Sequence, residues 1–144
     1  SADHYSFWKD RYPKLDWENG MFGENLTVKG LNETSLFIGD TFKVGEAIIQ
    51  VSEPRLPCYK LGIRFGTQKI IKEFTNSTFC GAYVRVLKKG LIKPLDRLEL
   101  IEKCNIITLS ELYALLTTDK NNHLLINKAL KEPSLSKSII QKIS

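Results

Sequence analysis

One stretch decides the fold: Val51-Ser52-Glu53-Pro54-Arg55-Leu56-Pro57-Cys58-Tyr59-Lys60-Leu61-Gly62-Ile63-Arg64-Phe65-Gly66. Residues 47–51, which lead into it, are β-branched or apolar apart from one glutamine, and this composition predicts a strand. The two prolines end the strand, because proline has no backbone N–H to donate to a sheet. The four residues after Cys58 suit a short helical turn. Cys58 is therefore predicted where a strand passes into a rigid loop, a common place for reactive groups.

Two cations flank this cysteine in the sequence, Arg55 and Lys60. Nearby positive charge favours the thiolate, which is the form of cysteine that attacks electrophiles and binds metals. The alternative is a buried cysteine that behaves as a small apolar residue. The stretch by itself gives the two interpretations equal weight.

Four segments carry a resemblance to a known family. They are Arg55-x-Pro57-Cys58-x-Lys60-Leu61, the earlier Phe22-Gly23-Glu24-Asn25-Leu26, the later Gly81-Ala82-Tyr83-Val84-Arg85-Val86-Leu87 with Gly90, and the tail from Ile107 onward. The first three resemble the cysteine loop, the Phe-Gly-Glu-Asn-Leu segment and the closing strand and turn of MOSC domains, which are related to the C-terminal part of molybdenum cofactor sulfurases. The tail is similar to the helical appendage of the YiiM-like branch of that family. The segments cover nearly the whole chain in family order.

The pattern of short strands, together with this resemblance, predicts a mainly β fold: a small closed or partly open β-barrel with covering helices and a C-terminal three-helix appendage. Strands are expected near residues 26–28, 36–38, 41–44, 47–52, 79–87 and 98–102. Gly39-Asp40 and Gly45-Glu46 suit two-residue hairpin turns, and closely spaced strands are typical of a small barrel. Helices are expected over residues 3–12, with Asp3 as the cap, and over residues 67–74.

The tail is predicted to be helical. Thr108-x-x-Glu111 is a capping-box pattern, a second helix is expected over residues 122–131, and Ser134 is expected to cap a third. Three short helices bury little on their own. We therefore expect them to pack together and against the barrel, or against a partner subunit in a homodimer. The predicted division is a barrel domain at residues 1–104 and the appendage at residues 105–144.

Composition argues against several function classes. Cys58, Cys80 and Cys104 are odd in number and include no Cys-x-x-Cys, which opposes a disulfide framework or a zinc knuckle and favours a reducing compartment, the cytoplasm. His4 and His123 match no metal-ligand spacing. The net charge of +5 comes from scattered lysines, so no nucleic-acid partner is expected. No apolar run has the length of a membrane span, so no membrane association is expected.

The resemblance assigns roles to particular residues. In relatives the loop cysteine is taken to bind the molybdenum of the pterin cofactor or to handle sulfur, and by position that cysteine is Cys58. Guanidinium and ammonium groups pair well with phosphate, so Arg55 and Lys60 suit the phosphate-bearing tail of the molybdenum cofactor (molybdopterin), with Arg64 a weaker candidate. Glu24 and Asn25 are expected to make polar contacts to cofactor or substrate.

The function implied by the resemblance is that of a molybdenum-dependent oxidoreductase. It would reduce small N-hydroxylated compounds, such as the base analogue 6-N-hydroxylaminopurine. No flavin, haem or iron–sulfur motif is visible, so the electrons are expected from a separate reductase. The alternatives are a non-catalytic sulfur-carrier or molybdopterin-binding module that uses Cys58, and an interaction domain that uses the helical tail.

Relatives of this branch carry an earlier segment, with a strand and a Gly/His-rich stretch, ahead of the aromatic helix. The present sequence starts at Ser1-Ala2-Asp3-His4-Tyr5. The N-terminal part of the barrel domain, which would help to form the pocket, is therefore expected to be missing from residues 1–144.

Overall fold

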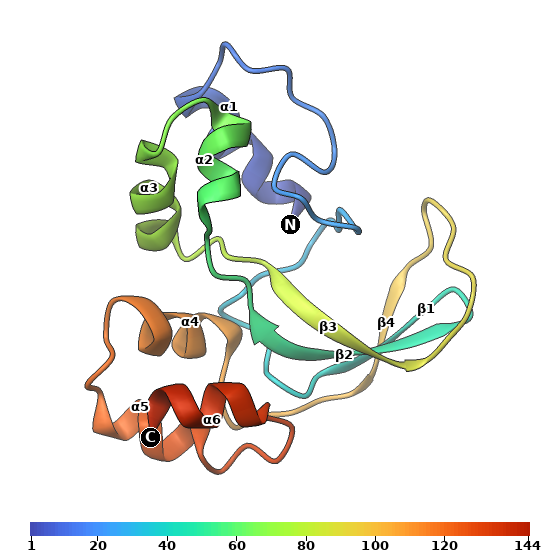
Figure 1. The fold of residues 1–144 in the computed structure, drawn as a ribbon. Helices are drawn as coiled ribbons and strands as arrows, with labels where there is room; N and C mark the ends of the chain where they lie inside the picture. Colours follow the sequence, from blue (N-terminus) through green and yellow to red (C-terminus); the bar gives the residue numbers. More distant parts are fainter.

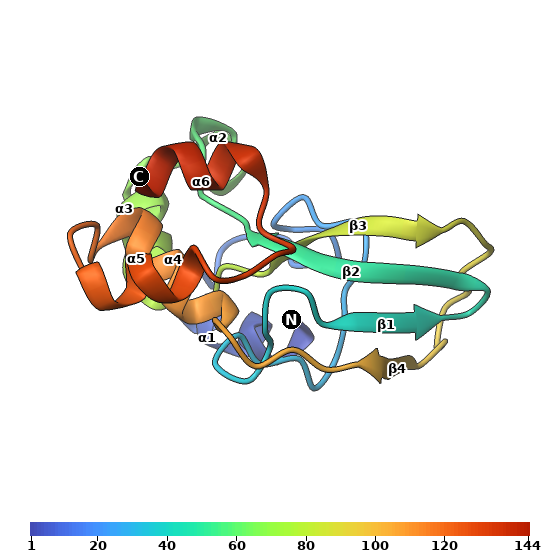
Figure 2. The same cartoon turned by 90° about the horizontal axis from the view of Figure 1, so that it is seen from below.

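The computed structural model describes all 144 residues as one antiparallel sheet with helices gathered at one end (Figures 1 and 2). Figure 1 shows α1, α2 and α3 above this end of the sheet and α4, α5 and α6 below it, while the strands extend away from both groups. The strands are β1 (Thr41–Val44), β2 (Ala47–Pro54), β3 (Ala82–Lys88) and β4 (Leu98–Glu102). The helices are η1 (Ala2–His4), α1 (Tyr5–Arg11), α2 (Tyr59–Phe65), α3 (Lys69–Ser77), α4 (Leu109–Thr117), α5 (His123–Ala129) and α6 (Lys137–Ile143).

The sheet has the strand order β3-β2-β1-β4, and every neighbouring pair is antiparallel. β1 and β2 form the expected hairpin, with Gly45 at a φ of +54° in its turn. The register sets Phe42 opposite Ile49 and Leu100, and Ile49 opposite Val86, so one face of the sheet is apolar across all four strands. β3 and β4 form the two edges.

The predicted barrel does not close. β3 and β4 lie at opposite edges of the sheet, and no pairing joins them. With six α-helices around four strands, the fold is mixed α and β, so the prediction of a mainly β fold was wrong. The predicted strands at residues 26–28 and 36–38 do not form. The second of these segments instead bonds to the start of α4, through Ile38 N–H to the Ile107 carbonyl at 3.0 Å and Leu109 N–H to the Leu36 carbonyl at 2.7 Å.

One apolar core joins the barrel segment to the tail. A cluster of 19 buried residues includes Trp8 of α1, Val51 of β2 and Phe74 of α3 together with Leu112 of α4 and Ile139 of α6. A separate small cluster on the sheet is made of Val44, Ala47 and Ile49. No helix combines the length and the apolar character needed to cross a bilayer.

A second junction lies where the α5–α6 connection meets the sheet. Gly39 has a φ of +90°, and a Cβ at this position would lie 2.7 Å from Cys104 Sγ and 2.9 Å from Ser134 Oγ. Only glycine allows both this backbone conformation and this close approach. Arg85 of β3 also donates to the Ser134 carbonyl, at 2.7 Å.

The helix caps agree with the sequence at α4 and differ elsewhere. The Thr108–Glu111 capping box is present. The third tail helix begins at Lys137, so its cap is Ser136, whose hydroxyl accepts from the Ile139 amide at 3.3 Å, and not Ser134. At the N-terminus the cap is Ser1, while the Asp3 carboxylate accepts from the Gly30 amide at 2.6 Å and so ties the first helical turn to the following loop.

Candidate functional site

Cys58 is exposed and occupies the N-cap position of α2. Its backbone is extended, with φ −135° and ψ 169°, because β2 has ended at Pro54 and the helix begins only at Tyr59. The Cys58 side chain makes no capping hydrogen bond. Cys80, by contrast, is buried, and burial raises the pKa of its thiol, which keeps it protonated. Of these two cysteines, Cys58 is the one whose sulfur a ligand can reach.

Arg55 precedes this cysteine and has a buried donor without a partner. Its amide donates to the Gly81 carbonyl at 3.1 Å, which fixes the loop against the start of β3. Its guanidinium lies over Phe74, with Cζ 5.7 Å from the ring centroid, and Nη1 is buried without a hydrogen-bond partner. Leaving such a donor unsatisfied costs about 1–3 kcal/mol. The guanidinium is therefore set up to receive an acceptor, and a phosphate oxygen is one that suits it.

The two segments that the sequence marked are neighbours in space. A Cβ on Gly23 would lie 4.0 Å from Nη2 of Arg55, so the 20–27 loop lies against the cysteine loop. Gly23 has a φ of +78°, which leaves its backbone close to the guanidinium without strain.

Glu24 points into its own loop. Its carboxylate accepts hydrogen bonds from the Gly20 amide at 3.1 Å, the Phe22 amide at 3.0 Å and the Thr27 hydroxyl at 3.1 Å, and also from the Tyr5 hydroxyl. Burial opposes its ionisation, but these hydrogen bonds outweigh burial and hold the pKa of Glu24 below its usual value. Burial and the bond to Glu24 raise the pKa of Tyr5 to about 12. In this structure Glu24 shapes the loop that carries Gly23 and Asn25.

The remaining predicted site residues lie on the surface around these loops. Asn25 and Lys60 are exposed and form no side-chain hydrogen bond or ion pair. Arg64, on the next turn of α2, is paired with Glu18 at 2.9 Å. No group of three or more His, Cys, Asp or Glu side chains comes together to hold a metal ion. The roles assigned to these residues stay predictions.

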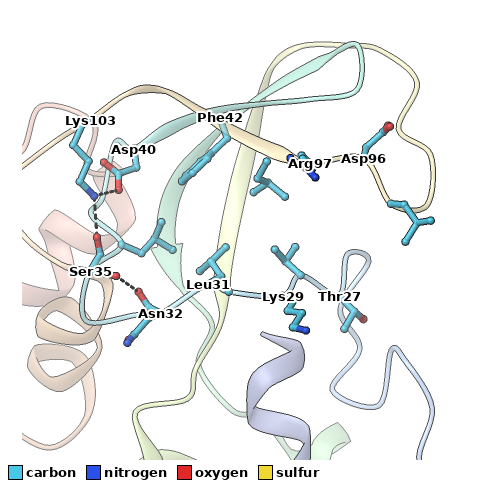
Figure 3. Close-up of a pocket in the computed structure, with 15 residues that line it drawn as sticks. Thr27, Lys29, Leu31, Asn32, Ser35, Asp40, Phe42, Asp96, Arg97 and Lys103 are labelled. Carbon is cyan, nitrogen blue, oxygen red and sulfur yellow. Dashed lines mark hydrogen bonds and ion pairs between the residues drawn. The ribbon is translucent and has the colours of Figure 1, made fainter.

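A sizeable cavity lies apart from the predicted site. It has a volume of about 590 Å³ and lies between the 27–36 loop and the β4 side of the sheet (Figure 3). Lys29 and Arg97 line it together with Phe42, and Lys103 reaches the buried Asp40 at 2.7 Å. None of the predicted cofactor residues lines this cavity.

Sequence reasoning missed two parts of this arrangement. It grouped Tyr5 with the packing aromatics, although the Tyr5 hydroxyl bonds Glu24 and accepts from the Met21 amide at 3.2 Å. It also missed the cavity, because two stretches far apart in the chain, residues 27–42 and 95–103, line it. The short spacing of Gly20, Gly23 and Glu24 was the only local sign of a tightly hydrogen-bonded loop.

The chain is similar in sequence to a known protein family and to proteins from other organisms. The family model described as MOSC domain matches residues 1–99. The Bacillus subtilis (strain 168) protein named "Uncharacterized protein YflK" is 38% identical over 138 residues, which is 95% of this chain and 62% of that protein. A Gibberella moniliformis (strain M3125 / FGSC 7600) protein named "Reductase" is 36% identical over 106 residues, 72% of this chain and 19% of that protein. The chain therefore spans less than two thirds of either relative.

A solved structure has the same fold. The crystal structure of YiiM from Geobacillus stearothermophilus superposes with a TM-score of 0.91 at 29% identity. The superposition covers 99% of this chain and 75% of that chain. The fold of residues 1–144 is thus shared with the matched part of that crystal structure.

Proposed function

Because the chain belongs to the MOSC domain family, we propose that it binds a molybdenum cofactor at Cys58 and Arg55 and reduces N-hydroxylated compounds. One observation carries the proposal: the same short loop holds the exposed thiol of Cys58 and the guanidinium of Arg55, whose buried Nη1 lacks an acceptor. Soft metals prefer thiolate, and phosphate suits guanidinium. The relative named "Reductase" supports an oxidoreductase reaction.

The residues present fit such a group. Cys58 brings a single thiol, and it belongs to no group of three or more His, Cys, Asp or Glu side chains that could hold a metal ion by themselves. A metal at Cys58 must therefore bring its remaining ligands with it, as an organic cofactor does. When bound, the cofactor supplies two-electron chemistry at the N–O bond of the substrate.

Each residue has a defined task in this proposal. Cys58 anchors the metal as thiolate, and Arg55 donates from Nη1 and Nη2 to the phosphate. Gly23 lets the 20–27 loop approach the guanidinium, and Glu24 holds that loop in shape. Asn25 offers a free amide to cofactor or substrate. Overall, R–NH–OH takes up two electrons and two protons, the N–O bond breaks, and the products are R–NH₂ and water.

The test measures metal and turnover together. The protein is expressed in a host that makes the cofactor, and molybdenum and pterin are quantified per chain. Reduction of 6-N-hydroxylaminopurine is then followed with dithionite as the electron source. We expect molybdenum in the wild type and in Cys104→Ser, which is the matched thiol control, and at least a tenfold loss of metal and activity in Cys58→Ser.

Two results would count against the proposal. A wild type that contains no molybdenum, or a Cys58→Ser variant that keeps full activity, removes its basis. Mass spectrometry after incubation with polysulfide, which transfers a sulfane sulfur to the Cys58 thiolate and leaves as a polysulfide one sulfur shorter, tests the carrier alternative. A labile sulfur increment on Cys58 without any turnover would indicate a sulfur carrier instead.

A further inference from the structure

The outward face of α2 is apolar and basic. Tyr59 and Ile63 are 65% and 68% exposed, although both are large hydrophobic side chains. They lie four residues apart, as do the exposed Lys60 and Arg64, so each pair shares a stripe on the helix surface. Cys58 immediately precedes this helix.

Positive charge is concentrated around this helix. Residues 55–78, which span the cysteine loop, α2 and α3, contain five Lys or Arg and one carboxylate, Glu73. Their net charge is therefore +4 out of +5 for the whole chain, and the other 120 residues contribute only +1. The scattered appearance of the lysines in the sequence concealed this concentration. The five cations are Arg55, Lys60, Arg64, Lys69 and Lys72; the last four are exposed, whereas the Arg55 guanidinium lies over Phe74 and is not counted in the outward surface.

The carboxylates beside these cations do not cancel the charge. Glu18 pairs with Arg64 at 2.9 Å, but the two side chains are 72% and 50% exposed. Glu73 pairs with Lys69, whose side chain is 76% exposed. Exposed ion pairs contribute only about 0–1 kcal/mol, so a partner's carboxylates can replace them at little cost. Lys60 and Lys72 take part in no ion pair.

We propose that this face of α2, together with the exposed lysines of the neighbouring α3, docks an acidic redox protein, the electron donor for the proposed reduction. The inference rests on the proposed function and names where the donor binds. Exposed aromatic and aliphatic side chains supply the anchor of such an interface, and the cations around them match a partner rich in Asp and Glu. Docking at α2 brings the donor to the helix that begins directly after Cys58.

An acidic redox protein suits both the electrons that the reaction needs and the charge of this surface. Two electrons leave the donor for each N–O bond reduced, which takes two molecules of a one-electron carrier such as a [2Fe–2S] ferredoxin, and two protons come from water. Complexes of redox proteins are small and are steered by charge, which suits a single helix face. A nucleic acid fits less well, because the aliphatic Ile63 offers nothing to a phosphate backbone.

The experiment compares two electron sources for the cofactor-loaded protein. An acidic [2Fe–2S] ferredoxin, kept reduced, is the protein probe, and dithionite is the small reductant that needs no docking. The double variant Ile63→Glu/Lys72→Glu is expected to lower the ferredoxin-supported rate about tenfold and to leave the dithionite-supported rate within about twofold. Raising the salt concentration should lower only the ferredoxin-supported rate.

A matched control carries the same two changes elsewhere. Leu124 is 82% exposed on α5 and Lys131 is exposed just after it, so Leu124→Glu/Lys131→Glu should behave as wild type. Equal ferredoxin-supported rates in all three proteins would overturn the docking site.

Binding of ferredoxin is also measured without turnover, by thermophoresis. This separates the docking site from the proposed function: a dithionite rate of zero rejects the function, while binding that the α2 variant weakens still supports the surface. No binding, or tighter binding of a single-stranded oligonucleotide through the same residues, rejects the surface.

Discussion

Glu24→Gln tests how the 20–27 loop is held beside Arg55. The substitution keeps the length of the side chain but replaces one acceptor oxygen by an NH₂ group and removes the charge. The Phe22 amide, which donates to Oε2 at 3.0 Å, then faces a donor, and the bonds from Gly20 and Thr27 to Oε1 weaken. Hydrogen bonds to a charged group contribute about 1.5–3 kcal/mol, so we expect a loss of that size in the free energy of unfolding at pH 7.

The stability difference between wild type and Glu24→Gln should depend on pH. The pKa of Glu24 is lowered in the folded protein, so its ionisation stabilises the fold above the ordinary Glu pKa of about 4.3, and this stability is lost as pH falls through the folded-state value. The stability gap between wild type and Glu24→Gln should therefore be full at pH 7 and narrow in acid. Urea unfolding followed by circular dichroism at several pH values measures it.

The matched control is Glu18→Gln. This carboxylate is 72% exposed and has one partner, Arg64, so its loss should change stability by less than about 1 kcal/mol. A Glu24→Gln variant as stable as Glu18→Gln at pH 7, or a gap that does not depend on pH, would refute the loop argument.

Three other substitutions test the packing by urea unfolding. Gly39→Ala must push a Cβ to 2.7 Å from a sulfur and should cost about 1–3 kcal/mol, more than Gly66→Ala, which also has a positive φ (+67°) but open space around it; equal losses would contradict the close approach. Trp8→Ala removes a side chain that is 1% exposed and should cost about 3–5 kcal/mol, and a loss below about 1 kcal/mol would show that the site repacks. Thr108→Ala breaks the capping box and should cost about 0.5–2 kcal/mol, whereas Thr108→Ser should restore most of it.

Local patterns predicted the regular elements well. The β1–β2 hairpin, β3, β4, the turn of helix after Cys58 and the three tail helices all follow from periodicity, proline, glycine and capping signals. These signals act over a few residues, so the sequence displays them directly. The capping box at Thr108 is the clearest case, because both of its hydrogen bonds join residues three apart.

Long-range arrangements were not visible in the same way. Leu36 and Ile38 have strand-like composition, but their backbone partners are Leu109 and Ile107, about seventy positions away. Whether a sheet closes depends on which edges meet, and no local pattern encodes that. Glu33 shows the same limit at the side-chain level. It is buried because it accepts from the Gly81 amide at 3.1 Å and lies 3.4 Å from His4.

The candidate site was found by resemblance and not by local chemistry. Its two segments are about thirty residues apart, and only the fold shows that Gly23 lies against Arg55. Arg55 Nη1 is unpaired and Glu24 points inward because of neighbours that only the folded chain brings beside them.

The shared core predicts how the chain behaves when it is produced as two separate pieces. Trp8 and Ile143 belong to the same buried cluster, and the backbone of residues 36–38 is bonded to that of residues 107–109. Two separately produced halves, 1–104 and 105–144, would each present half of a complementary apolar surface. We expect them to reassemble when mixed, because each piece covers the apolar surface that the other exposes.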